Sequence, residues 1–136
     1  MKIIIILLSL VAIVFTNTCG GNCPSNDCDS CPCGTEQKPL DINNWCAQHD
    51  WDQQCCQCIV QHESGGNSHA MNENTDGSYD VGLWQINDYN WGVCNSGNIP
   101  CDPQENLNCA IDVYNWGEQT WKFWVTCEVC GCCNHN

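Results

Sequence analysis

Two acidic side chains, Glu63 and Asp80, have the settings in this chain that best suit catalysis. Glu63 follows the apolar run Cys58, Ile59 and Val60, whereas Asp80 follows a Thr-Asp-Gly-Ser turn among hydroxyl and amide side chains. An apolar setting favours a protonated carboxyl group, and a polar, hydrogen-bonded one favours its ionised form. A proton donor paired with a carboxylate is the arrangement that cleaves glycosidic bonds. The pair therefore predicts acid-assisted hydrolysis of a sugar polymer.

Glu63 should stand at the end of an amphipathic helix. Asp50 is expected as its N-cap, with Gln53 three residues later, and residues 65–66 are glycines that should end it. Both the buried stripe and the negative end of the helix dipole should raise the pKa of Glu63, as a general acid requires. The alternative is an ordinary exposed acid near a helix end. Residues at helical spacing before Glu63 are Cys55, Cys58, Ile59 and His62.

A polar hairpin is predicted over residues 71–81, turning at Asp76-Gly77. Its polar side chains should lie near one another, orient sugar hydroxyls and keep Asp80 ionised. The alternative is a plain surface hairpin with turn-forming Asn and Asp. The polar positions are Asn72, Asn74, Ser78 and Asp80.

The strongest helical pattern lies over residues 102–117, where Asp102 as N-cap, a proline and Glu105 form a capping start and Gly117 a stop. Shorter helices are expected over residues 41–49 and 121–126. The apolar stripe of the long helix is Leu107, Ala110, Ile111 and Tyr114.

Export is predicted from the first 18 residues, in which one Lys precedes a short apolar run typical of a signal peptide. An uncleaved membrane anchor is the alternative. All 16 Cys follow this leader, so we expect a disulfide framework rather than the zinc sites that two Cys-x-x-Cys pairs would otherwise suggest. The expected organisation is a signal peptide over 1–18, a Cys-rich segment with a linker over 19–40, and one domain over 41–136.

The formal net charge of −13, with 16 acids against 3 Lys and no Arg, argues against nucleic acid or anionic membranes as partners. It also opposes binding to anionic polymers at neutral pH. Carboxylates lose charge as they are protonated. We therefore expect secretion, or delivery to an acidic digestive compartment such as a lysosome or phagosome.

The central stretch resembles lysozymes of the chicken type (c-type). Residues 58–64 read Cys-x4-Glu-Ser, and residues 80–87 read Asp-x-Gly-x-x-Gln-Ile-Asn, with the family's interval of 17 between Glu63 and Asp80. The resemblance covers about half of the chain. Its further elements are Asn98-Ile99-Pro100-Cys101, Asn108-Cys109-Ala110 and Trp121-x-x-Trp124.

The resemblance implies an α+β fold, mainly helical with a small β-hairpin lobe and rich in disulfides. Glu63 would be the proton donor, and Asp80 the nucleophile or electrostatic stabiliser of a retaining mechanism. That mechanism is established for the type member of this family, and for this chain it is an expectation that the resemblance carries. Trp121 would pack on the catalytic Glu, although it could instead belong only to the core. The implied substrate-binding residues are Asn72, Asn74, Gln85, Asn87, Trp91 and Trp121.

The resemblance also implies the bridges Cys58–Cys127 and Cys94–Cys101, whereas the family's usual partner for Cys109 is not evident. We expect Cys109 to pair with a cysteine near either terminus. The family's first helix has no clear counterpart, and the Cys-rich segment stands in its place.

Three functions are open. The first is a muramidase that hydrolyses the β-1,4 bond between N-acetylmuramic acid and N-acetylglucosamine, in digestion or antibacterial defence. The second is a lytic transglycosylase that uses Glu63 alone, and the third is a non-catalytic carbohydrate-binding relative. The presence of Asp80 at the hydrolase spacing favours the first. We expect a monomer that binds bacterial peptidoglycan, uses no metal or cofactor and does not insert into membranes.

Overall fold

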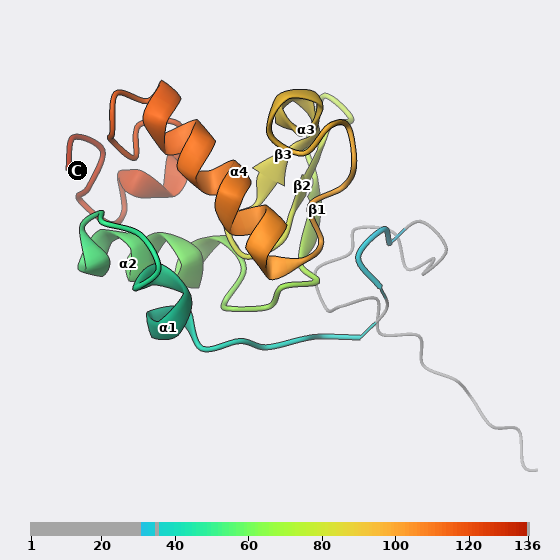
Figure 1. The fold of residues 1–136 in the computed structure, drawn as a ribbon, viewed down its shortest axis with the longest axis horizontal. Coiled ribbons are helices and arrows are strands. Elements are labelled where there is room, and N and C mark those ends of the chain that lie inside the picture. Colours follow the sequence, from blue (N-terminus) through green and yellow to red (C-terminus); the bar gives the residue numbers. More distant parts are fainter. Residues whose placement is uncertain (1–30, 35, 136) are drawn as a thin grey trace, which may run out of the picture.

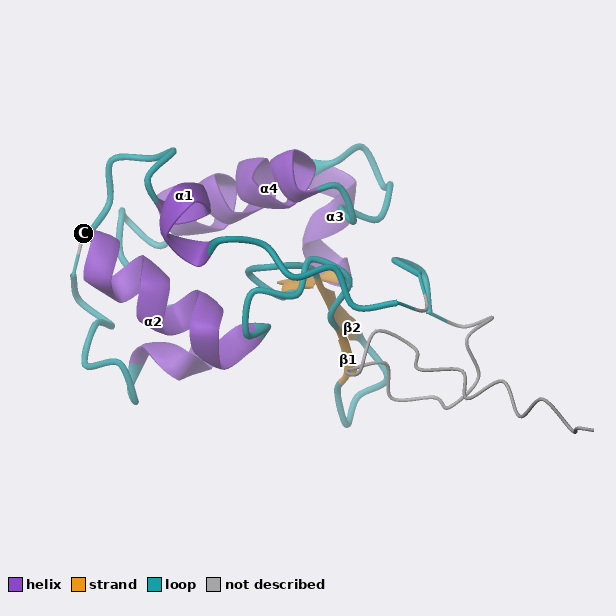
Figure 2. Cartoon of the chain, turned by 90° about the horizontal axis from the view of Figure 1, so that it is seen from below, coloured by secondary structure: helices purple, strands orange, loops and turns teal. Residues whose placement is uncertain are grey.

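The computed structural model describes residues 31–34 and 36–135 of the chain, so the expected signal peptide and most of the Cys-rich segment lie outside the described residues. Helices α1, α2 and α4 lie together, with the small sheet at one end of this group (Figures 1 and 2). This confirms the mainly helical α+β class. The elements in chain order are α1 (Ile42–Cys46), α2 (Gln53–Glu63), β1 (Met71–Glu73), β2 (Tyr79–Val81), β3 (Ile86–Asn87), α3 (Asp88–Cys94), α4 (Pro103–Trp116) and the 3₁₀ helix η2 (Val125–Cys127).

Helix α2 begins two residues later than the sequence predicted. Asp52, not Asp50, is its N-cap and accepts a hydrogen bond of 2.8 Å from the backbone N–H of Cys55. The side chain of Gln53 instead donates to two carbonyls of the preceding turn. The expected capping box is therefore wrong, because Gln53 folds back onto the turn.

The end of α2 is as predicted. Its last residue is Glu63, Ser64 is the C-cap, and Gly65 and Gly66 follow with φ of 61° and 84°. Such positive φ values suit glycine and prevent the helix from continuing.

Helix α4 also begins as predicted. The Asp102 carboxylate accepts from the backbone N–H groups of Gln104 and Glu105, and Pro103 occupies the first helical position. One face of the helix is buried. Its buried residues are Asn106, Leu107, Cys109, Ala110, Val113 and Tyr114.

The predicted hairpin is strands β1 and β2, to which β3 adds a third antiparallel strand. The register places Asn72 and Asn87 directly across from Asp80, one on each neighbouring strand. Strand β3 is too short to show a periodic pattern, and the sequence analysis missed it together with α3. The helix expected over residues 121–126 is wrong, because this segment contains only turns and the start of η2.

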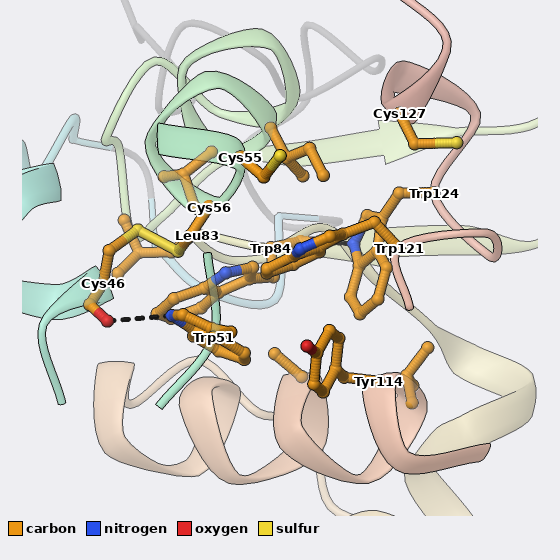
Figure 3. Packing of buried hydrophobic residues seen from close by; sticks show 14 of the residues in the cluster. Cys46, Trp51, Cys55, Cys56, Leu83, Trp84, Tyr114, Trp121, Trp124 and Cys127 are labelled. Atoms are coloured by element: carbon orange, nitrogen blue, oxygen red, sulfur yellow. Dashed lines mark hydrogen bonds between the residues drawn. A yellow bond between two sulfur atoms is a disulfide. The ribbon is translucent and has the colours of Figure 1, made fainter. Parts of the chain in front are cut away.

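Aromatic side chains fill the space between α2 and α4 (Figure 3). Trp121 lies between the rings of Trp51 and Trp124, at centroid distances of 4.9 and 5.1 Å. Tyr114 approaches from α4, 5.1 Å from the Trp121 ring. Burial of aromatic rings contributes strongly to a core of this size. Helix α2, which ends at Glu63, and Trp124 both contribute to this core.

Residues 36–40 pack on the domain, although the sequence suggested a linker. Pro39 forms an isolated β-bridge with Asn67, and the Leu40 N–H donates to the carbonyl of Gly66 at 2.8 Å. The Cys33–Cys101 disulfide fixes the segment farther upstream. This part of the chain therefore borders the loop between α2 and β1.

The predicted Cys58–Cys127 bridge is wrong. Cys58 is bonded to Cys130, and Cys127 is bonded to Cys133. The chain turns after η2, where the Cys132 N–H donates to the Cys127 carbonyl. This turn brings Cys133 back to Cys127 and leaves Cys130 beside α2. The tail is still tied to α2, as expected.

The predicted Cys94–Cys101 bridge is also wrong. Cys94 is bonded to Cys109, and Cys101 to Cys33. Helices α3 and α4 pack against each other, which places the Cα atoms of Cys94 and Cys109 4.9 Å apart. Cys109 therefore does not pair with either terminal segment. All described cysteines are disulfide-bonded.

Candidate functional site

A cavity of about 770 Å³ lies between the small sheet and the segment after α4. Glu63 and Asp80 both line it. One wall is polar and comes mainly from β1 to α3, and the other is apolar and comes from α4 and residues 123–126. The lining is Glu63, Asn72, Asn74, Asp80, Gln85, Ile86, Asn87, Asn90, Val113, Trp116, Phe123, Trp124, Val125 and Thr126.

Glu63 projects from the last turn of α2 and is half-buried. Burial raises the pKa of its carboxyl group, and the nearby charge of Asp80 raises it further. A hydrogen bond of 2.6 Å from Thr126 and the charge of His62 act in the opposite direction. Burial has the largest effect, so the balance favours a carboxyl group that keeps its proton.

Asp80 lies in the middle of β2 and faces amide groups. Asn74 donates to one carboxylate oxygen at 2.9 Å, and Asn87 donates to the other at 2.8 Å. The hydroxyl of Ser78 accepts from both amides and donates to Asp76. Amide donors form strong hydrogen bonds with an ionised carboxylate. The sheet thus holds Asp80 in one orientation.

Asn72 and Gln85 also face the cavity. Asn72 stands across from Asp80 on β1, and its amide is 3.4 Å from the side-chain oxygen of Asn74. Gln85 has a φ of 49°, and its amide donates to the carbonyls of Ala70 and Gly82. Four of the six expected substrate-binding residues therefore line the cavity.

The two remaining expected residues, Trp91 and Trp121, are not among the cavity-lining residues. Trp121 is fully buried at 0% exposure, and the indole N–H of Trp91 donates to the carbonyl of Ile86. Trp124 instead lines the cavity, and its indole N–H donates to the carbonyl of Trp84. The sequence offered both members of the Trp-x-x-Trp pair, and spacing alone did not separate the core residue from the cavity residue.

Asn106 is a positioning residue that the sequence analysis missed. It is fully buried on α4, donates to the carbonyls of Val81 and Pro100, and accepts from the N–H of Trp84. These bonds hold the loop after β2. An asparagine beside Leu107 on an otherwise apolar stripe was the available signal, because a buried amide must be hydrogen-bonded.

Ser64 connects the two acidic elements. Its hydroxyl lies 2.8 Å from the carbonyl of Leu83, which belongs to the loop after β2. Ser64 follows Glu63 directly, and Leu83 is three residues after Asp80. This contact therefore fixes the end of α2 relative to the sheet.

Two groups of Cys and His side chains have the spacing of metal ligands within the described chain. Their sulfur atoms already form the Cys55–Cys132 and Cys58–Cys130 disulfides. Zinc is bound by thiolates, and a disulfide offers none. The four cysteines of these groups are therefore structural cross-links in the oxidised protein. Among the described helices, none has the length and apolar character needed to cross a membrane.

Comparison with known proteins agrees with this fold. A family model described as "Lysozyme like domain" matches residues 49–126. Lysozyme X from Drosophila melanogaster is 34% identical over 87 residues, which are 54% of this chain and 60% of that relative. The crystal structure of a lysozyme from Litopenaeus vannamei matches with a TM-score of 0.50 and 26% identity, over 67% of this chain and 86% of that chain.

The fold and the matched region define the class of protein. The chain belongs to the lysozyme family. It spans three-fifths of the length of the curated Drosophila relative.

Proposed function

We propose that this protein is a secreted muramidase, which hydrolyses the β-1,4 bond between N-acetylmuramic acid and N-acetylglucosamine in bacterial peptidoglycan. The observation that carries the proposal is that Glu63 and Asp80 line one cavity in opposite environments. Membership in the lysozyme family supports the same substrate class.

The proposed reaction has two steps with retention of configuration. Glu63 gives its proton to the glycosidic oxygen as the bond to the anomeric carbon breaks, and the leaving sugar departs with a hydroxyl group. Asp80 attacks the anomeric carbon or stabilises its positive charge from the opposite face. Glu63, now ionised, removes a proton from water, which attacks the anomeric carbon and releases Asp80.

The cavity walls suit a glycan chain. Side-chain amides on the polar wall can bind hydroxyl and acetamido groups, and the apolar wall can pack on sugar rings. Trp116 and Phe123 are 45% and 58% exposed there, so a ligand can reach their rings. The amides are Asn72, Asn74, Gln85, Asn87 and Asn90.

Export and an acidic working compartment belong to the same proposal. The described cysteines are all oxidised, as expected for a secreted protein, and the net charge of −13 opposes binding to an anionic wall at neutral pH. Digestion of bacteria, with an antibacterial effect, fits these properties. The protein acts as a monomer in this proposal.

Replacing Glu63 tests the proposed acid. We expect Glu63→Gln to lower turnover by about 10²–10⁴-fold at every pH, because an amide cannot protonate the leaving oxygen. Asp80→Asn should lower turnover strongly and leave binding of oligosaccharide intact. The measurement is clearance of a bacterial wall suspension from pH 3 to 8. Glu73→Gln is the matched control, because Glu73 is exposed on β1 and does not line the cavity.

Product analysis then distinguishes the reaction types. A hydrolase leaves reducing ends, whereas a lytic transglycosylase leaves 1,6-anhydro ends. Near-normal turnover by Glu63→Gln would overturn the assignment of the acid. Binding of wall fragments by the unaltered protein without cleavage at any pH would make it a carbohydrate-binding relative.

A further inference from the structure

A second, smaller cavity opens from the same two acids. It has a volume of about 380 Å³ and shares four residues with the larger cavity. Its one additional residue is His62, an exposed side chain in the last turn of α2. The cavity lining is His62, Glu63, Asn72, Asp80 and Gln85.

His62 is the only side chain able to carry positive charge among the described residues that line these two cavities. The remaining lining is neutral or acidic. A protonated imidazole donates from both ring nitrogens and pairs well with a carboxylate. Burial favours the protonated, neutral form of Glu63. A neutral Glu63 repels an incoming anion less than an ionised Glu63 would.

The surroundings leave His62 free to make such a contact. Its ring nitrogen lies within 4.8 Å of the sulfur atoms of the neutral Cys58–Cys130 disulfide. Helices α1 and η2, which pack on α2, contain no ionisable side chain apart from bonded cysteines. The tail that disulfides join to α2 carries Glu128 and His135, and neither lines the cavity. Glu63 and Asp80 are therefore the titratable groups that share its cavity.

We propose that His62 forms a carboxylate subsite, which selects wall glycan bearing an acidic substituent beside the cleaved bond. This rests on the proposed muramidase function. N-acetylmuramic acid carries a lactyl ether with a carboxyl group, which N-acetylglucosamine lacks, and stem peptides carry further carboxylates. Histidine side chains as a class gain positive charge between pH 8 and pH 5.

The test compares three substrates. The first is a neutral N-acetylglucosamine oligomer, and the second is a peptide-free oligomer of alternating N-acetylmuramic acid and N-acetylglucosamine with free lactyl carboxylates. The third is a glycan that bears stem peptides, so that its lactyl groups are amidated. The variants are His62→Gln and His62→Lys, with His135→Gln as the matched control because His135 lines neither cavity. Values of kcat and KM are measured at pH 5 and pH 7.5.

At pH 5, His62→Gln should raise KM for the carboxylate-bearing oligomer by about two- to fivefold, the range for a solvent-exposed charge pair. The KM for the neutral oligomer should change less than twofold, and His62→Lys should keep a low KM for the acidic substrate at both pH values. An effect on the peptide-free oligomer identifies the lactyl group, and an effect restricted to the peptide-bearing glycan identifies stem-peptide carboxylates. Equal KM increases for all three substrates would overturn the subsite.

Binding separates this proposal from the hydrolytic one. Calorimetry of Glu63→Gln, with and without His62→Gln, measures affinity for the same oligomers without turnover. A preference for the acidic oligomers that is lost with His62 supports the subsite even if the unaltered protein cleaves nothing. No preference at pH 5 would overturn it even if the protein is an active muramidase.

Discussion

Glu63 and Asp80 carry the same functional group, and their neighbours decide what each can do. Burial at the end of α2 raises the pKa of Glu63, while two side-chain amides hold the Asp80 carboxylate on the sheet. The two carboxyl groups have different environments because different elements, α2 and β2, carry them. Thr126 reduces this difference, because its hydroxyl donates a hydrogen bond to Glu63 and so lowers the Glu63 pKa.

Replacing Thr126 should move the pH dependence of the reaction. Thr126→Val removes a hydrogen bond that lowers the Glu63 pKa, so that pKa should rise. In the proposed mechanism Glu63 works in its protonated form, so activity should fall as the pH rises through its pKa. The alkaline limb of the kcat/KM profile should therefore shift to higher pH, as measured with a soluble oligosaccharide.

Thr120→Val is the control for this change. The Thr120 hydroxyl donates to the carbonyl of Gly117, and Thr120 does not line the cavity. Its alkaline limb should coincide with that of the unaltered protein. An alkaline limb that moves to lower pH in Thr126→Val would contradict the assigned role of Thr126.

At the scale of elements, the loop between β2 and β3 holds the site together. Asn106 on α4 and Ser64 at the end of α2 both bond to this loop. Gly82 begins the loop with a φ of 80° and packs directly against the Asn106 side chain. A side chain at position 82 would occupy the place of the Asn106 amide. The relative placement of the two acids thus depends on a glycine that lines neither cavity.

Gly82→Ala should destabilise the fold and lower turnover. The left-handed backbone and the clash with Asn106 together should cost roughly 3 kcal/mol or more. Chemical unfolding with intact disulfides measures the loss. Gly77→Ala is the matched control, because Gly77 has a φ of 85° but no atom within 4 Å of the added Cβ. It should lose only about 1–2 kcal/mol, the cost of the left-handed backbone alone. Equal losses in the two variants would show that contact with Asn106 is unimportant.

At the scale of the whole molecule, disulfides offset the self-repulsion that a large net charge brings. Disulfides connect α2 to the tail, α3 to α4, and α1 to α2. Each such bridge typically contributes about 2–4 kcal/mol by restricting the unfolded chain. This covalent framework lets the protein tolerate its net charge of −13. We expect the charge to govern encounter with the proposed anionic substrate.

Salt should therefore stimulate the reaction on bacterial walls at neutral pH. Raising the ionic strength from 0.01 to 0.15 M shortens the Debye length from about 30 to about 8 Å and screens repulsion from an anionic wall. The rate on wall suspensions at pH 7 should rise severalfold and the KM should fall. At pH 4.5 the effect should be smaller, because some carboxylates are protonated.

A neutral oligosaccharide serves as the control for this prediction. Its KM should not depend on salt at either pH. Inhibition of wall clearance by salt at pH 7 would show that a local positive surface, rather than the net charge, governs binding.

Much of the helical structure followed from local signals. Asp102, Pro103 and Glu105 mark the start of α4, and the paired glycines after Glu63 mark the end of α2, because caps and stops depend on neighbouring residues alone. The start of α2 was misplaced, since Asp50 and Asp52 are equally good caps by type. The short elements β3 and α3 left no periodic signal. The disulfide pairs depended on helix packing, which spacing along the chain does not report.

By itself, the sequence determined the types of the acids, the 17-residue interval between them, the polar hairpin and the supply of cysteines. The tertiary structure alone decided that Trp124 lines the cavity while Trp121 is buried, that Asn106 holds the loop beside Asp80, and which cysteines are joined. The physical reason is that residue type and local spacing set caps, turns and amphipathic faces. Burial and pairing between distant segments are set by the way whole elements pack.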